Sequence, residues 1–425
     1  MTDPWSLLTL QFAARFGDRS GARSWFVPGR IEVFGKHVDY AGGRSLLAAI
    51  DRGFHIIARP RPDKRVHLVD ARSRQALAGV IDPDLPQHPG TWTDYPVTVL
   101  RRIARDFPDA RTGMDAVVLS TLPSAAGLSS SSALVIATFL PLAEFNSLHH
   151  DQRFREFCTP GPRLADYLGA VENGRAFGPF EADFGVGTQG GSQDHSAIIC
   201  CSSDRLAQVR FRPTELESQV SFPDDWCFVV AASGVPAPKG GAVREHYNAL
   251  ANDAATLLNA WNHSRGEDCQ SLLRILESDP DAGTELERLI GGLPQADRLI
   301  RRLGQFRRET TELIPAAVSA LESRDLDSFG ALVSESALVG DQALANQVEP
   351  TRDLCRLAGR FGAAGASGFG AGFGGSVYAV VRRDAVDSFA RDWREEYRRL
   401  HPELAERSDF LIVRPGDGAS EVSPT

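Results

Sequence analysis

A run of small residues at 123–133 has the composition of a phosphate-binding loop. It reads PSAAGLSSSSA and leads directly into the apolar residues 134–136. Small residues let the backbone approach a ligand closely, and the free N–H groups at the start of a helix attract phosphate oxygens. A flexible Ser/Gly linker would instead lead into polar sequence, and the Gly-Lys-Ser/Thr ending of a Walker A loop is missing. We therefore expect a phosphate-binding loop that opens a helix.

A second cluster of glycines, at residues 365–376, precedes the expected strand 377–381. Residues 370–375 match GxGxxG, but the dinucleotide-binding fingerprint requires a strand before the glycines and a helix after them. The triplet Asp-Phe-Gly at 183–185 also occurs in protein kinases. In that family the glycine loop precedes this triplet and an HRD motif lies between them, so the inverted order here excludes it.

A third segment, residues 28–43, is dense in hydrogen-bonding side chains. It reads PGRIEVFGKHVDYAGG and places Arg30, Lys36, His37 and Asp39 beside apolar residues and between glycines. A surface turn would explain the glycines but not this concentration of polar groups. Recognition of a polyol in a pocket explains both.

Together the three segments resemble the GHMP small-molecule kinases, and residues 28–43 resemble the galactokinase signature of that family. The signature reads approximately PGRVNLIGEHTDYNGG, and the chain shares with it Pro28, Gly29, Arg30, Gly35, His37, Asp39, Tyr40, Gly42 and Gly43. The serine-rich segment is similar to the family's PxxxGLSSS motif, and the C-terminal cluster to its TGAGFGG motif. The segment 190–194 is similar to the family's CGxxDQ, with His195 where glutamine is usual.

The resemblance implies a set of site residues. Asp194 is expected to act as general base toward the sugar's anomeric hydroxyl, with Arg30 facing it and stabilising charge on the phosphoryl group. The residues expected to bind the sugar are Lys36, His37, Asp39, Gly191 and Tyr247. The residues expected to bind ATP are Gly127, Leu128, Ser129, Ser130, Ser131, Gly372 and Gly374. Ser131 and Glu172 are expected to hold Mg²⁺, with Ser130 as an open alternative to Ser131, and Glu181 or Asp183 as alternatives to Glu172.

Two positions depart from the signature. Lys36 stands where galactokinases have a glutamate that contacts the sugar near C6, and Glu32 stands where they have asparagine. Either Lys36 meets an acceptor or anion near C6 of the substrate, or Glu32 and Lys36 form an ion pair that leaves specificity unchanged.

The function implied is ATP-dependent phosphorylation of the C1 hydroxyl of a galactose-like monosaccharide. A kinase for a uronic acid or arabinose is one alternative. Another GHMP branch, acting on mevalonate or homoserine, would lack His37, Asp39 and Tyr40 as a set. A catalytically idle sensor would typically have lost Asp194 or Arg30.

These side chains need a mixed α and β framework to position them, and the periodicity of the sequence predicts one. Strands are expected at residues 54–59, 66–69, 116–120, 227–232 and 377–381, and helices at 97–106, 132–145, 242–261, 309–322 and 385–400. We expect an α+β protein with two domains, residues 1–215 and 216–425. The resemblance implies a ribosomal-protein-like N-terminal domain, a ferredoxin-like C-terminal domain and a site between them.

The composition limits the partners. The chain has 425 residues and a formal net charge of -9, which argues against a general affinity for nucleic acid or an anionic membrane. Six cysteines without CxxC spacing predict reduced thiols rather than a disulfide scaffold. With neither a basic, apolar leader nor an apolar span, we expect a cytoplasmic protein. A small-molecule sugar is the expected partner, and a monomer is expected, with a homodimer as the alternative.

Overall fold

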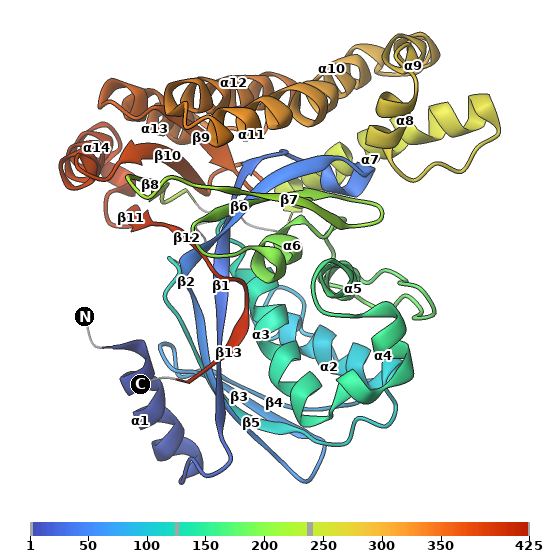
Figure 1. The fold of residues 1–425 in the computed structure, drawn as a ribbon. Coiled ribbons are helices and arrows are strands. Elements are labelled where there is room, and N and C mark those ends of the chain that lie inside the picture. Colours follow the sequence, from blue (N-terminus) through green and yellow to red (C-terminus); the bar gives the residue numbers. More distant parts are fainter. Residues whose placement is uncertain (1–2, 124–126, 236–240, 424–425) are drawn as a thin grey trace.

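Two β-sheets and their covering helices build the chain (Figure 1). The computed structural model describes residues 3–123, 127–235 and 241–423, without the side chains of residues 241–244. Helices and strands alternate along the sequence, which confirms the expected α+β class. The predicted strands and four of the five predicted helices lie within observed elements of the same type, apart from one residue at the start of the helix predicted at 385–400. The helix predicted at 309–322 spans the π-helical turn at 308–313 and the α-helix at 314–322.

The larger sheet has nine described strands in the order β13-β1-β2-β5-β3-β4, with β12 and β6 beside β2 and β7 beside β6. The pairs are antiparallel except β3 with β5, which is parallel. The strands are β1 (Arg23–Phe34), β2 (Arg44–Pro60), β3 (Arg65–Asp70), β4 (Ala76–Val80), β5 (Met114–Ser120), β6 (Arg205–Arg210), β7 (Glu215–Ser221), β12 (Pro415–Gly416) and β13 (Ser420–Val422).

Helices cover both faces of this sheet. Successive side chains of a strand point to opposite faces, and the strands carry apolar residues on both. On β5, Val117 and Leu119 pack with Leu8 and Phe12 of α1 (Pro4–Phe16). Their neighbour Val118 belongs to the main core, which contains α3. The helices on that second face are α2 (Asp94–Asp106), α3 (Ser130–Phe145), α4 (Gln152–Phe157), α5 (Pro162–Asn173) and α6 (Gln193–Cys200), with the short turns η1 (Asp39–Ala41) and η2 (Leu148–His150).

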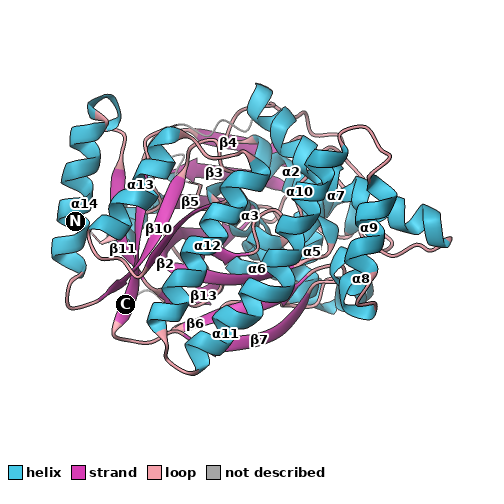
Figure 2. Cartoon of the chain, turned by 90° about the horizontal axis from the view of Figure 1, so that it is seen from above, coloured by secondary structure: helices cyan, strands magenta, loops and turns pink. Residues whose placement is uncertain are grey.

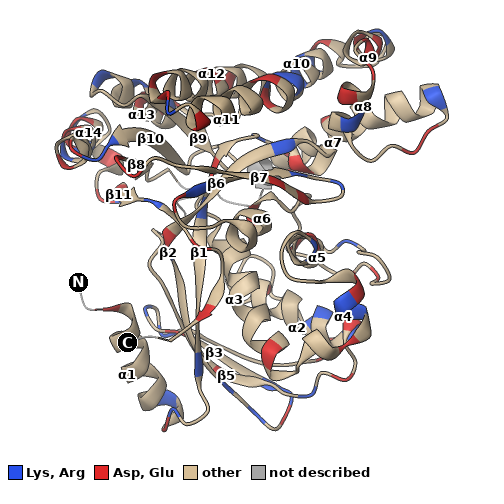
Figure 3. Cartoon of the chain, viewed as in Figure 1, with Lys and Arg blue, Asp and Glu red and all other residues tan. Residues whose placement is uncertain are grey.

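The smaller sheet has the order β11-β8-β10-β9 and separates two helical layers. On β8, Val229 faces a core with α13 and α14, while Val230 faces the main core with α11 and α12. The elements are β8 (Trp226–Ala232), β9 (Gly365–Phe369), β10 (Ser376–Arg382), β11 (Asp409–Val413), α11 (Ile314–Glu322), α12 (Leu326–Leu344), α13 (Glu349–Arg360), α14 (Val386–Leu400) and η4 (Pro402–Leu404). The helices α13 and α14 contain both Lys/Arg and Asp/Glu residues, and both colours are visible on α14 in Figure 3.

A helical group at one end of the molecule covers the signature loop (Figure 2). Its core includes Val38, Tyr40 and Ala41 of that loop. The signature segment 28–43 therefore packs against helices from the back half of the chain. The group consists of α7 (Gly241–Arg265), α8 (Leu272–Ser278), α9 (Ala282–Ile290) and α10 (Ala296–Arg307), and continues into the π-helical turn η3 (Arg308–Leu313).

The expected domain boundary at residue 215 coincides with the first residue of β7, which pairs with β6 in the larger sheet. The last strands also return to this sheet, since β12 pairs with β2 and β13 with β1. Division at residue 215 stays a prediction. Within the described residues, no helix combines the length and apolar character required to cross a membrane.

Candidate active site

A cavity of about 860 Å³ lies where the larger sheet, the start of α3, the start of α6 and the turn between β9 and β10 meet. It brings together residues far apart in the sequence. The predicted site residues that line it are Arg30, His37, Asp39, Gly127, Ser129, Ser130, Ser131, Glu172, Gly191, Asp194, Tyr247, Gly372 and Gly374.

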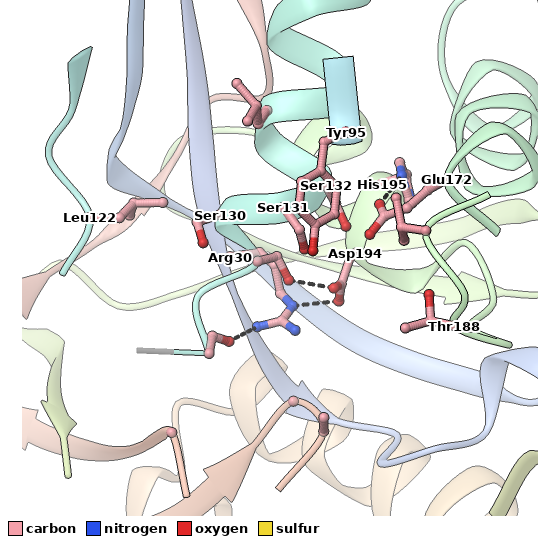
Figure 4. A pocket seen from close by; sticks show the side chains of 18 of the residues that line it. Arg30, Tyr95, Leu122, Ser130, Ser131, Ser132, Glu172, Thr188, Asp194 and His195 are labelled. Carbon is pink, nitrogen blue, oxygen red and sulfur yellow. Dashed lines mark hydrogen bonds and ion pairs between the residues drawn. The ribbon is translucent and has the colours of Figure 1, made fainter. Parts of the chain in front are cut away.

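Arg30 and Asp194 face one another in this cavity (Figure 4). Arg30 Nε donates to Asp194 Oδ1 over 2.7 Å, and Arg30 Nη1 donates to the carbonyl oxygen of Gly127 over 2.7 Å. The guanidinium also lies 5.7 Å from the centre of the Phe369 ring, and Arg30 is only 3% exposed. The planar guanidinium thus joins β1 to the phosphate loop and to α6 in one fixed orientation.

Asp194 sits in the first turn of α6 and is held on both carboxylate oxygens. Ser129 Oγ donates to Oδ2, opposite the bond from Arg30 to Oδ1. Ser129 is the residue before α3 and has a positive φ of 57°, which turns the chain from the loop into the helix. The side chain of Asp194 keeps 29% exposure, so the carboxylate is oriented and still open to the cavity.

The back half of the chain holds the backbone of the signature loop in place. Gly35 has a φ of 95°, and a Cβ there would lie 2.2 Å from Ser45 Oγ, so only glycine fits. The Gly35 N–H donates to Glu309 Oε2 over 3.0 Å. Gln305 Nε2 donates to the carbonyl oxygen of Lys36 over 3.0 Å, and Arg302 donates to that of His37. The loop therefore takes its shape from α10 and η3.

His37 is a neutral, oriented ring. Burial, together with the nearby charge of Arg302, lowers the pKa of His37 to about 3. Asn346 Nδ2 lies 3.2 Å from His37 Nε2 and also donates to the carbonyl oxygen of Ala371, so Nε2 is the accepting nitrogen. Nδ1 then carries the proton and donates to Tyr40 Oη over 3.2 Å.

Asp39 is positioned by two neighbours from the segment 190–194. Its Oδ2 accepts from the Gln193 N–H over 3.2 Å, and burial raises the pKa of Asp39. A Cβ on Gly191 would lie 2.1 Å from the same Oδ2, so glycine is required for this close approach. The Tyr247 ring lies 5.4 Å from that of His37, and burial raises the pKa of Tyr247. Asp39, His37 and Tyr247 thus form one polar wall.

The expectation that Lys36 contacts the substrate is wrong in this geometry. Lys36 is 4% exposed and is not among the described residues that line the cavity. Its Nζ donates to Ser336 Oγ on α12 over 2.6 Å and lies 3.9 Å from Glu309 Oε1. The alternative, an ion pair with Glu32, is also replaced, because Glu309 is the carboxylate within ion-pair distance. Charge complementarity with η3 draws the ammonium away from the cavity.

The phosphate side of the cavity combines the two glycine-rich motifs. Gly127, Ser130 and Ser131 line it from the start of α3, and Gly372 and Gly374 line it from the opposite turn. Leu128 was expected to bind ATP, but its side chain does not line the cavity. It is 2% exposed and packs in the main core. Residues 124–126, the first half of the predicted loop, lie outside the described residues.

Glu172, from the last turn of α5, lines the cavity near Ser131 and contacts His195 (Figure 4). His195 Nε2 and Glu172 Oε2 are 3.0 Å apart, an ion-pair distance whose angles do not make a well-directed hydrogen bond. Asp183, the alternative to Glu172, instead pairs with Arg101 at 2.9 Å. The described residues contain no group of three or more His, Cys, Asp or Glu side chains that could hold a metal ion.

Sequence reasoning missed the aromatic lining of the cavity and several of its polar residues, among them Glu32. Phe54, Trp92 and Tyr95 line the cavity. Aromatic residues beside a Pro-Gly turn, as at residues 89–95, are too common to have identified it. Glu32 lines the cavity as well. Glu32 could have been predicted from the sequence, because side chains two residues apart in a strand point to the same face and Arg30 lies two residues before it.

Comparisons with known proteins agree with this site. The sequence profile described as galactokinase galactose-binding signature matches residues 10–60, that of the GHMP kinases N terminal domain matches 94–161, and that of GHMP kinases C terminal matches 317–399. A galactokinase from Enterococcus faecalis is 25% identical over 98% of this chain and 99% of its own length. A galactokinase from Lactiplantibacillus plantarum is 27% identical over 98% of this chain and 99% of its own.

The fold matches as well. The crystal structure of Lactococcus lactis galactokinase complexed with galactose superimposes with a TM-score of 0.81, at 23% identity, over 99% of this chain and 100% of that one. The chain belongs to the GHMP kinase family, and the expected GHMP kinase fold is confirmed. Its signature at residues 10–60 places it in the galactokinase-like branch.

Proposed function

We propose that this chain is a sugar kinase that transfers the γ-phosphoryl group of ATP to the anomeric hydroxyl of a galactose-like monosaccharide. The products are a sugar 1-phosphate and ADP. The observation that carries the proposal is the contact between Arg30 and Asp194, which lies between the sugar-signature loop and the phosphate loop in one cavity. The galactokinases among its relatives, and the galactose named with the Lactococcus lactis structure, support the choice of sugar.

Asp194 acts as the general base. Its carboxylate accepts the proton of the anomeric hydroxyl while that oxygen bonds to the γ-phosphorus. The bond from the γ-phosphorus to the bridging oxygen breaks, and ADP leaves with the electron pair. Arg30 holds the carboxylate through Nε. The positive charge of its guanidinium also stabilises negative charge on the phosphoryl group during transfer. Ser129, on the other carboxylate oxygen, fixes the direction from which the proton is taken.

His37, Asp39 and Tyr247 bind and orient the sugar. Buried Asp39 presents carboxylate oxygens that match hydroxyls, and Gly191 leaves room for Asp39 to reach them. His37 contributes by ring contact, since Asn346 and Tyr40 engage its two nitrogens. Holding the anomeric oxygen in line with the γ-phosphorus accounts for much of the rate that such a site can supply, because there is little covalent chemistry for the protein to perform.

ATP occupies the remaining length of the cavity. The N–H groups at the start of α3, together with Gly372 and Gly374, bind the phosphates. The aromatic lining residues Phe54, Trp92 and Tyr95 supply the surface that binds the purine by stacking and apolar contact. This arrangement places the γ-phosphate next to Asp194 and the base against these aromatic residues.

Glu172 and Ser131 fit a magnesium ion, because both are oxygen donors on the same side of the cavity and Mg²⁺ combines one or two such groups with phosphate oxygens and water. When bound, the ion neutralises charge on the phosphates. Glu172→Gln is expected to raise the Mg²⁺ concentration for half-maximal activity several-fold while changing KM for the sugar little. An unchanged Mg²⁺ titration would assign the ion to another carboxylate.

The test is ADP release by the purified chain with ATP and a panel of free sugars. We expect release that depends on galactose and is saturable. ATP hydrolysis at the same rate with and without every sugar would overturn the proposal.

A further inference from the structure

Glu32 is a buried carboxylate in the wall of the cavity. It lies on β1 two residues after Arg30, is 4% exposed and lines the cavity. Residues two apart in a strand point to the same face and are about 7 Å apart, a separation close to the width of a six-membered sugar ring. With Arg30 at the proposed point of phosphoryl transfer, Glu32 lies about one sugar ring away on the same face of β1.

One oxygen of this carboxylate is satisfied by the protein and the other is not. Gln193 Nε2 donates to Oε2 over 2.5 Å. Oε1 is buried and has no hydrogen-bond partner within the described ranges of the chain. Buried polar atoms in folded proteins almost always have a partner, and an orphan is costly. An orphan oxygen in a binding cavity indicates a partner that arrives with the ligand.

The charges around Glu32 do not supply this partner. Burial raises the pKa of Glu32 to about 8, with Lys36 and Arg30 opposing the rise and Asp194 adding to it. Lys36 is committed to Ser336 and Glu309, and Arg30 to Asp194 and Gly127. A group that can both donate and accept satisfies Oε1 whether or not Glu32 carries its proton, and a hydroxyl is such a group.

We propose that Oε1 of Glu32 hydrogen-bonds one hydroxyl of the sugar, on the side of the ring away from the anomeric carbon, and that Glu32 thereby sets substrate specificity. This inference rests on the proposed function. It assigns to Glu32 the role that Lys36 was expected to have. The substrate class is a neutral sugar that keeps this hydroxyl. A deoxy sugar leaves Oε1 unpaired, and a uronic acid brings an anion to a wall that already holds Glu32 and Asp39.

The experiment compares kcat/KM for galactose, for its 2-, 3-, 4- and 6-deoxy analogues and for galacturonate in wild type and in Glu32→Leu. In wild type, kcat/KM for one deoxy analogue is expected to be roughly tenfold or more below that for galactose, because a site built to hydrogen-bond a hydroxyl rejects the analogue that lacks it. In Glu32→Leu, galactose and that analogue are expected to be used about equally well. This coupling between one side chain and one hydroxyl identifies the contact.

Three further variants keep the test decisive. Glu32→Asn, too short to reach both Gln193 and the sugar, makes the same comparison if Glu32→Leu does not fold. Glu32→Gln removes the charge that the carboxylate carries above its pKa of about 8, so at pH 9 it is expected to improve the use of galacturonate relative to galactose roughly tenfold. Glu144→Gln is the matched control, because Glu144 pairs with Arg23 and does not line the cavity. It is expected to keep the wild-type ranking.

The outcomes separate the two proposals. If wild type phosphorylates galactose and the Glu32 variants rank all the sugars as wild type does, this inference is overturned and the proposed function stands. If wild type phosphorylates none of the sugars, the proposed function fails and this inference fails with it.

Discussion

Arg30 Nε lies 2.7 Å from Oδ1 of Asp194, so a cation on β1 and a carboxylate on α6 are locked together 164 residues apart in the sequence. The same guanidinium donates to the carbonyl oxygen of Gly127 at the phosphate loop. One side chain therefore sets the position of the candidate base relative to the candidate phosphate site, and the proposed chemistry depends on both of its contacts.

Replacing Arg30 by lysine tests this dual contact. An ammonium cannot direct donors to Asp194 and to the Gly127 carbonyl in the fixed geometry of a guanidinium. Arg30→Lys is expected to lower kcat about 100-fold with a smaller change in the KM for ATP. Steady-state kinetics with galactose check it. A kcat within a factor of about three of wild type would show that only the charge matters.

Lys36→Glu is expected to destabilise the protein instead of changing its choice of sugar. The variant would bury a second carboxylate next to Glu309, and breaking a buried pair in this way costs about 3–5 kcal/mol. Urea unfolding measures the loss. The double variant Lys36→Glu with Glu309→Lys is expected to recover part of it. A stable Lys36→Glu protein with a new ranking of sugars would return Lys36 to the substrate site.

Gly191→Ala is expected to raise KM for the sugar at least tenfold and to change ATP affinity little. The added Cβ would lie 2.1 Å from Asp39 Oδ2, so Asp39 must leave the position in which it meets the sugar. Gly359→Ala is the matched control, because a Cβ there, at the end of α13, meets no atom within 4 Å. Equal KM values for Gly191→Ala and wild type would remove Asp39 from the sugar site.

The buried state of His37 predicts a pH dependence of stability. Its pKa is lowered from 6.5 to about 3, so the unfolded chain binds this proton more readily than the native protein does. The contribution of His37 to the free energy of unfolding is fully present above pH 6.5 and decreases as the pH is lowered toward 3. At pH 5 the decrease is about 2 kcal/mol. His37→Gln is expected to lose less stability than wild type between pH 7 and pH 5 in urea unfolding. Parallel losses in the two proteins would mean that His37 ionises in the folded state.

Local patterns in the sequence were enough to predict the mixed fold, and most of the predicted site residues line the cavity. The glycine and serine motifs specify backbone shape within a few residues, so Gly127, Ser131 and Gly372 could be assigned to the cavity without long-range information. Similarity to the signature placed His37 and Asp39 correctly in the same wall.

The direction of Lys36 could not be predicted, because it is decided by Ser336, 300 residues further along the chain, and by Glu309. Leu128 shows a related limit, since a motif names a run of residues but not which of them turns toward the core. The return of β12 and β13 to the larger sheet depends on pairing with β2 and β1, and such short strands leave little pattern of their own.

The most direct test of the proposed transfer is ³¹P NMR of the products formed from ATP and galactose by wild type and by Asp194→Asn. The amide is close in shape to the carboxylate but cannot accept the proton of the anomeric hydroxyl. We expect wild type to form galactose 1-phosphate and ADP, and Asp194→Asn to form almost none while still binding ATP. A phosphate at another carbon in the wild-type product, or turnover by Asp194→Asn within about tenfold of wild type, would contradict the account.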